Sequence, residues 1–278
     1  MSTRVETLPN PLAPTAPSGG ALWVLADAWT VAQRFLRHWR QQPGPVLIGW
    51  FFPVLILLMF GALFGGAITV PGGGSYFEFL MPGMFALAMF FGLEATVLGV
   101  TTDTQKGVTD RFRTLPISGG AIVLGRCLAD LLNSLVALVI LIGTGLALGW
   151  RWHNGLTAAL AAIGLLVLFR FAMLWVGIVI GLTISGPEWV SAVQILVWPI
   201  GFLSSVFVDP LTMPGWLGAI AAWNPISITA SATRQLFGNP GYGGSTWLAE
   251  HAIGMAMLVP LFLTAIFMPL AAWAYRRG

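Results

Sequence analysis

The chain has 278 residues, of which 57% are hydrophobic and 8% are charged, whereas about 25% of the residues in an average soluble domain are charged. This composition excludes a water-soluble globular protein. It predicts an all-α integral membrane protein, because the chain has enough apolar residues for several spanning helices of roughly 20 residues each. The formal net charge is +3, and the single cysteine, Cys127, excludes both a disulfide framework and a cysteine-based metal site.

The segment before the first long apolar run has two parts. Residues 1–20 are rich in Ser, Thr, Pro and Gly, lack the apolar core of a signal peptide, and are predicted to be a disordered tail. Residues 21–44 place apolar side chains, including Trp29, on one helical face. Three arginines lie off that face: Arg34, Arg37 and Arg40. This pattern predicts an amphipathic helix on the inner membrane surface, either a simple anchor or also a contact for a cytoplasmic partner.

Six apolar runs of spanning length follow. They cover residues 45–66, 78–101, 127–149, 156–184, 189–208 and 252–274. At about 1.5 Å per residue, each run can cross a hydrocarbon core about 30 Å thick. We therefore predict a six-helix transmembrane domain over residues 45–278. Three Gly-xxx-Gly pairs would permit close helix contact: Gly61 and Gly65, Gly145 and Gly149, and Gly177 and Gly181.

The placement of positive charge predicts the orientation. With the N-terminus inside, all of the 13 Lys and Arg residues except Arg151, Arg170 and Arg234 lie on the cytoplasmic side. Arg151 and Arg234 then lie outside, and Arg170 lies within a helix. This asymmetry fits the positive-inside rule. We expect a multi-pass protein of the plasma membrane with both termini in the cytoplasm.

Four ionisable residues lie in or beside the apolar runs: Glu94, Arg126, Asp130 and Arg170. Such residues are costly in a bilayer, about 2.5–3.5 kcal/mol at its centre on insertion scales. The depths of Glu94 and Arg170 differ by about 11 Å, which a long arginine side chain can largely close, so we predict an ion pair between them. Arg126 and Asp130 are spaced i, i+4 and are predicted to pair at the membrane boundary. We favour structural roles for all four over contact with cargo.

The longest cytoplasmic connection, residues 101–126, reads TTDTQKGVTDRFRTLPISGGAIVLGR. Asp103 can cap a short helix that Pro116 ends or bends, while Arg111 and Arg113 remain in water. A passive, positively charged loop is the alternative interpretation.

In this connection the chain resembles the permeases of type 2 ATP-binding-cassette exporters, particularly the daunorubicin-resistance-like drug and lipid exporters. The matching pattern consists of Gly107, Arg111, Pro116, Gly125 and Arg126. The resemblance implies that the segment contains a coupling helix, which docks into a groove of the ATPase subunit. The residues expected to couple to that subunit are Asp103, Gly107, Arg111, Arg113, Pro116, Ile117 and Ser118.

The resemblance extends over most of the chain beyond residue 20 and includes the last outward segment. Residues 223–241, WNPISITASATRQLFGNPG, resemble the short external helices of the family. Asn224 is a suitable N-cap with Pro225 at the first helical position, and Arg234 follows in the same helix. With residues 214–223, this predicts two short helices that re-enter the outer leaflet, as a gate for cargo release or as a static lid.

No catalytic or cofactor-binding motif accompanies these features. Lys106 is the only lysine and lacks a surrounding Walker A sequence, so ATP and Mg are expected on a partner subunit. The three histidines are scattered, and no metal site is predicted.

The resemblance implies a transport subunit rather than an enzyme. It implies two permease subunits, identical or paralogous, two ATPase subunits, membrane lipids, and a hydrophobic drug, polyketide or lipid as cargo, with no nucleic acid. The alternatives are an intramembrane lipid-processing enzyme with Glu94 and Asp130 as acid and base, and a proton-coupled carrier.

Overall fold

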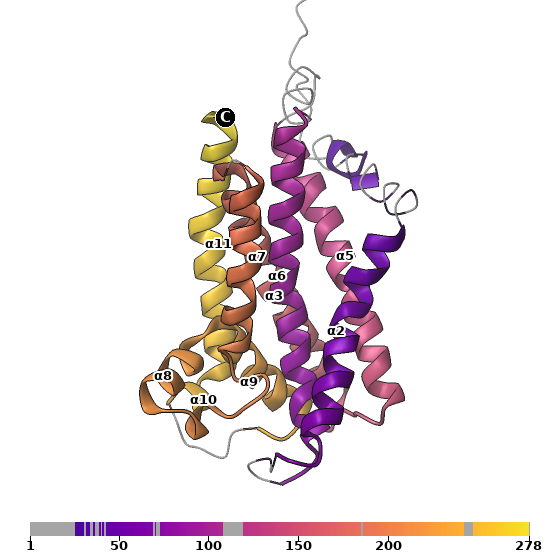
Figure 1. Cartoon of the computed structure of the whole chain (residues 1–278), viewed down its shortest axis with the longest axis vertical. Coiled ribbons are helices and arrows are strands. Elements are labelled where there is room, and N and C mark those ends of the chain that lie inside the picture. Colours follow the sequence, from indigo (N-terminus) through magenta and orange to yellow (C-terminus); the bar gives the residue numbers. More distant parts are fainter. Residues whose placement is uncertain are drawn as a thin grey trace, which may run out of the picture.

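The computed structural model describes residues 26–30, 32, 33, 36, 39, 41, 43–68, 70, 73–107, 119–184, 186–241 and 247–277. The fold within these ranges is all-α, and no strand occurs in them (Figure 1). The elements are α2 (Pro43–Phe64), α3 (Tyr76–Gln105), α5 (Gly119–Ala147), α6 (Gly155–Thr183), α7 (Pro187–Phe202), the 3₁₀ turn η1 (Pro210–Thr212), α8 (Gly215–Trp223), α9 (Pro225–Phe237), α10 (Trp247–Glu250) and α11 (Ala252–Arg277).

Among the described residues, five helices are long and apolar enough to cross a membrane: α2, α3, α5, α6 and α11. The predicted run at 189–208 corresponds to the shorter apolar helix α7, which ends at Phe202. From there to Asp209 the chain forms turns and bends. The fold is therefore an all-helical membrane bundle, as predicted, while a sixth crossing remains a prediction.

Helix α3 is the centre of the bundle and contacts α2, α5, α6, α7 and α9. Its most extensive contact is with α6, where the helices approach closely at two glycines. A Cβ at Gly181 would lie 2.7 Å from Val100 Cβ, and one at Gly177 would lie 3.1 Å from Thr96 Cβ. The close contact expected at Gly177 and Gly181 is thus confirmed.

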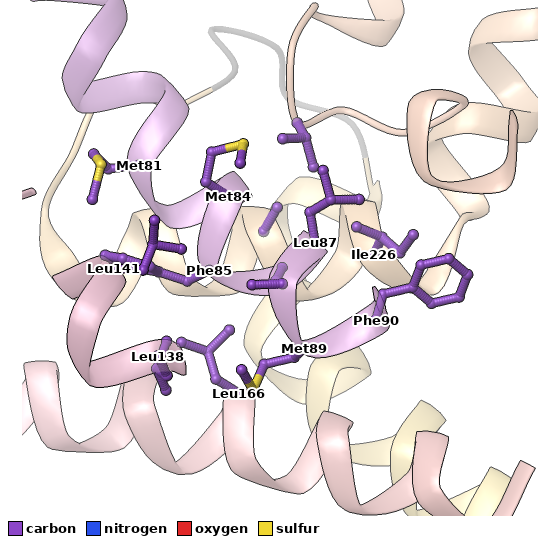
Figure 2. Close-up of a cluster of buried hydrophobic side chains, with 14 of the residues drawn as sticks. Met81, Met84, Phe85, Leu87, Met89, Phe90, Leu138, Leu141, Leu166 and Ile226 are labelled. Atoms are coloured by element: carbon purple, nitrogen blue, oxygen red, sulfur yellow. The ribbon is translucent and has the colours of Figure 1, made fainter. Parts of the chain in front are cut away.

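The apolar core surrounds the first half of α3. Figure 2 shows buried side chains of α3 together with side chains from α5, α6 and α9. The labelled members are Met81, Met84, Phe85, Leu87, Met89, Phe90, Leu138, Leu141, Leu166 and Ile226. Short helix α9 therefore belongs to the packed core and does not lie loosely on its surface.

The two ends of the bundle differ in what they carry (Figure 1). At one end lie the last turn of α3, the first turn of α5 and the last turn of α11, and we call it the C-terminal end. At the other end lie α8, α9 and α10, and we call it the α8–α10 end. The two ends therefore carry the two segments to which the sequence assigns function.

Large apolar side chains cover the outward surfaces of α2 and α11. The exposed examples are Leu47, Ile48, Phe51, Leu55, Leu58, Met59, Leu63, Met257, Leu258, Leu261, Phe262, Ile266, Met268, Leu270 and Trp273. A monomer in water rarely exposes so large an apolar surface, whereas lipid tails are as apolar as these side chains. The packing is that of a multi-pass membrane protein.

Candidate functional site

Arg126 connects α5 to α3 near the C-terminal end. Its Nε lies 3.3 Å from Asp130 Oδ2 on the same helix, and its Nη1 bonds Asp103 Oδ2 on α3. The predicted i, i+4 pair is thus confirmed. The N-cap role predicted for Asp103 is wrong, because α3 continues past Asp103 to Gln105. We call these three residues the Arg126 cluster.

The Arg126 guanidinium lies directly against the backbone of α3. A Cβ at Gly99 would collide with Arg126 Nη2, so only glycine leaves room there. The Arg126 side chain is 13% exposed and the Asp103 side chain 29% exposed. Such partly buried, charge-assisted hydrogen bonds are stronger than exposed ion pairs. They fix the last turns of α3 to the first turns of α5.

These two helices flank the segment in which the sequence predicts the coupling helix. Gly107 follows α3 with a φ of +62°, a left-handed conformation that glycine adopts without strain. The other predicted coupling residues lie outside the described residues: Arg111, Arg113, Pro116, Ile117 and Ser118. The Arg126 cluster therefore lies on the two helices that flank the predicted coupling segment.

Arg170 lies in the middle of α6 and is 1% exposed. Its Nε donates to Ser134 Oγ on α5 at 2.6 Å, and its Nη2 donates to Thr96 Oγ1 on α3 at 2.9 Å. A Cβ at Gly92 would lie 2.6 Å from Arg170 Cζ, so this guanidinium also packs against a glycine of α3. Arg170 thus joins the three helices α3, α5 and α6 in the interior.

The ion pair predicted between Glu94 and Arg170 is wrong. Glu94 Oε1 instead accepts a hydrogen bond from Gln194 Nε2 of α7 at 2.9 Å. Residues two apart on a helix point in different directions. Because Thr96 faces Arg170, Glu94 faces away from it and connects α3 to α7.

A chain of polar contacts joins the two arginines. Ser134 Oγ donates to the carbonyl of Asp130 at 3.0 Å and accepts from Arg170. The contacts therefore run without interruption from Asp103 at the C-terminal end to Arg170 in the interior. We call this set the arginine network: Asp103, Arg126, Asp130, Ser134, Arg170 and Thr96.

The second buried arginine centre lies at the α8–α10 end. Arg234 of α9 is 0% exposed. Its Nε donates to the carbonyl of Phe79 at 2.9 Å, and its Nη2 donates to the carbonyls of Ser205 and Val206 at 3.1 and 3.2 Å. Its Cζ also lies 3.9 Å from the centre of the Phe79 ring. The short helix predicted around Arg234 is present as α9, and Arg234 is buried because α9 packs against α3, α6 and α11.

Asn224 starts α9 as predicted. Its Oδ1 accepts from Ile226 N at 2.9 Å, and Pro225 occupies the first turn. Its Nδ2 donates to the carbonyls of Ile200 and Leu203 at 2.8 and 2.7 Å. Asn224 therefore also fixes α9 to the end of α7.

The N-terminal segment is described only in part. Trp29 is 47% exposed in a short helical piece. Arg34, Arg37 and Arg40 lie outside the described residues, so the amphipathic interface helix stays a prediction. In the described part of the chain, no group of three or more His, Cys, Asp or Glu side chains could hold a metal ion.

Sequence reasoning missed the residues that accommodate the arginines. Gly92, Thr96 and Gly99 recur on α3 at spacings of four and three, which places them on one face. Ser134 follows Asp130 by one turn of α5. A helical face made of small and hydroxyl residues in a membrane-spanning helix indicates that a large polar side chain, such as arginine, can pack against it from a neighbouring helix.

The family follows from comparison with known proteins. The sequence model described as ABC-2 type transporter matches residues 27–237, which is most of the chain. The chain belongs to this family. The permease is 35% identical to the daunorubicin resistance ABC transporter permease protein DrrB1 of Streptomyces coeruleorubidus, over 98% of each chain.

More distant relatives of this ABC-2 permease carry similar names. It is 24% identical to the probable doxorubicin resistance ABC transporter permease protein DrrC of Mycobacterium tuberculosis, over 100% of this chain and 97% of that protein. It is 27% identical to the putative transport permease ycf38 of Porphyra purpurea, over 87% and 86% of the two chains. The predicted resemblance is confirmed, and these names indicate a transport subunit rather than an enzyme.

Proposed function

We propose that this permease is the transmembrane subunit of an ATP-driven exporter that moves hydrophobic drug, polyketide or lipid-like molecules out across the plasma membrane. A separate ATPase subunit binds ATP and Mg and supplies the energy. The observation that carries this proposal is the 35% identity, over 98% of the chain, to a permease named for daunorubicin resistance. Names of relatives at 24% identity refer to doxorubicin, which supports the same class of cargo.

In the proposed assembly, two permease subunits pair in the membrane and each contacts one ATPase subunit. Helix α7 provides the sixth crossing, and both termini lie in the cytoplasm. The C-terminal end of the bundle faces the ATPase, in agreement with the positive charge of Lys106, Arg126, Arg276 and Arg277 near that end. Helices α8 and α9 then re-enter the outer leaflet at the opposite end.

The proposed mechanism starts at the connection between α3 and α5. Movement of the ATPase displaces the coupling helix in this connection, and the Arg126 cluster makes the flanking turns of α3 and α5 move together. Hydrogen bonds through Ser134 and Arg170 extend this constraint to α6. Chains of packed side chains and hydrogen bonds of this kind carry energetic coupling between distant sites.

We expect ATPase activity to copurify with this chain when it is expressed with its ATP-binding-cassette partner protein. Inside-out vesicles containing both proteins should accumulate doxorubicin only when ATP is present. The Arg111→Glu variant should lose most of the copurifying activity, because the substitution reverses a charge in the predicted docking segment.

The control for this experiment is Arg151→Glu, which reverses an exposed charge at the α8–α10 end and should leave copurification unchanged. Doxorubicin uptake that persists without any ATPase and collapses on addition of a proton ionophore would contradict the proposal. That result would indicate a proton-coupled carrier.

A further inference from the structure

A cavity of about 340 Å³ lies at the α8–α10 end of the bundle. Residues of η1, α8, α9 and α10 form its wall, which is mostly apolar. The volume lies within the range of about 300–1,000 Å³ that is usual for small-molecule sites. The larger apolar side chains on the wall are Leu211, Met213, Ile228 and Leu248.

One carboxylate, that of Asp209, is part of this apolar wall. Asp209 is 8% exposed, and its Oδ1 accepts a hydrogen bond from Leu211 N at 2.9 Å at the start of η1. Within the ranges that the structure describes, Leu211 N is the donor seen at this carboxylate. Burial of a carboxylate is costly unless a cation or several donors compensate it. A positively charged or donating group in the cavity would compensate the Asp209 carboxylate.

Three serines, Ser205, Ser227 and Ser231, add to the polar side of the cavity. Ser227 and Ser231 lie one turn apart on α9, and both are on its wall. Ser227 Oγ accepts from Ser205 N at 2.8 Å, which orients that hydroxyl. The wall thus combines one negative charge and three serines with an apolar surface, a combination that disfavours anions and strongly hydrophilic cations.

We propose that this cavity binds cationic amphiphiles, with a protonated amine at Asp209 and the ligand's apolar body against Leu211, Met213, Ile228 and Leu248. The proposal rests on the export function above, for which the cavity would be a site on the side where cargo leaves. The same chemistry occurs in an amine-bearing drug and in the headgroup of phosphatidylethanolamine.

The test uses the purified full-length permease in neutral detergent, without ATPase, and radiolabelled decylamine as the probe. Decanol, which has the same chain length and no charge, is the reference ligand. We expect Asp209→Asn to weaken decylamine binding by roughly tenfold or more, as expected for loss of a hydrogen bond to a charged group. The asparagine keeps Oδ1 as acceptor for Leu211 N, so decanol binding should stay unchanged.

Two further variants make the result specific. Glu250→Gln removes an exposed carboxylate at the same end, outside the cavity wall, and should leave decylamine binding unchanged. Ala222→Leu adds volume to the wall and should weaken binding of both decylamine and decanol. Equal decylamine affinity in the wild type, Asp209→Asn and Ala222→Leu would overturn the proposal.

Competition then separates the two sources of the ligand. Displacement of decylamine by doxorubicin would assign the cavity to cargo, and displacement only by phosphatidylethanolamine would assign it to lipid. The binding test contains no ATPase, and ATP-driven transport is measured separately in vesicles that contain both proteins. Transport can therefore be observed even if decylamine does not bind at Asp209. Failure of this inference is therefore distinguishable from failure of the export function.

Discussion

Replacing Arg126 with methionine is expected to destabilise the permease by about 3–5 kcal/mol, the usual cost of removing one partner from a buried ion pair. The substitution leaves two carboxylates, Asp103 and Asp130, in a partly buried position without the cation they share. Arg126→Lys should be intermediate, because a lysine cannot reproduce the forked geometry that bonds both carboxylates. Thermal unfolding in detergent measures the loss.

A triple variant separates stability from coupling. Arg126→Met combined with Asp103→Asn and Asp130→Asn removes the whole charge cluster, and it should regain most of the stability lost by Arg126→Met alone. ATP-driven doxorubicin transport should nevertheless remain low, since α3 and α5 are no longer bonded at their ends. An Arg126→Met variant that melts like the wild type would show that the cluster does not support the fold.

Replacing Arg234 with methionine is expected to have an effect of similar size at the opposite end, roughly 2–6 kcal/mol. Two buried carbonyls, those of Ser205 and Val206, lose their donor, and each loss costs about 1–3 kcal/mol. The carbonyls of Ser205 and Val206 lie between α7 and η1, where no helix supplies a replacement donor. Thermal unfolding with near-ultraviolet circular dichroism would report both the stability and the packing around Phe79.

Arg151→Met is the matched control for Arg234→Met, because Arg151 is an exposed arginine at the same end of the bundle. It should change the melting temperature little. A Gly83→Ala variant tests the same packing independently, since its Cβ would lie 2.9 Å from Arg234 Nη2. Wild-type melting of both Arg234→Met and Gly83→Ala would contradict the structural role of Arg234.

Helix α3 connects these two arginine centres. Gly92, Thr96 and Gly99 contact Arg170 and Arg126 on its later turns. The first turns carry Phe79 and Gly83, which contact Arg234 of α9. Helix α9 in turn forms part of the cavity wall. A movement of α3 that starts at the C-terminal end would therefore reach the proposed cargo site through direct contacts.

Most of the helical plan could be predicted from hydropathy. The predicted run 156–184 corresponds to α6, Gly155–Thr183, and the run 45–66 to α2, Pro43–Phe64. Asn224 and Pro225 were correctly placed at a helix start, because N-capping depends on neighbouring residues alone. The helices and the start of α9 could thus be predicted because they depend on the length of the apolar runs and on N-capping by neighbouring residues.

The pairing of the buried charges could not be predicted, because depth along a helix does not specify direction around it. Glu94 and Thr96 differ by only about 3 Å in depth, yet one contacts α7 and the other contacts α6. The contacts of Arg234 could not be predicted for the same reason. Its place in a short helix does not specify that its guanidinium faces the carbonyls of α3 and of the segment before η1.

Cysteine labelling determines which side of the membrane the C-terminal end of the bundle faces. In a Cys127→Ala background, Lys106→Cys and Arg151→Cys place single exposed thiols at opposite ends of the bundle. With a membrane-impermeant maleimide, we expect Arg151→Cys to label in right-side-out vesicles and Lys106→Cys to label only in inside-out vesicles. Labelling of Lys106→Cys from the outside would contradict the account, because no cytoplasmic ATPase could then contact the segment that follows α3.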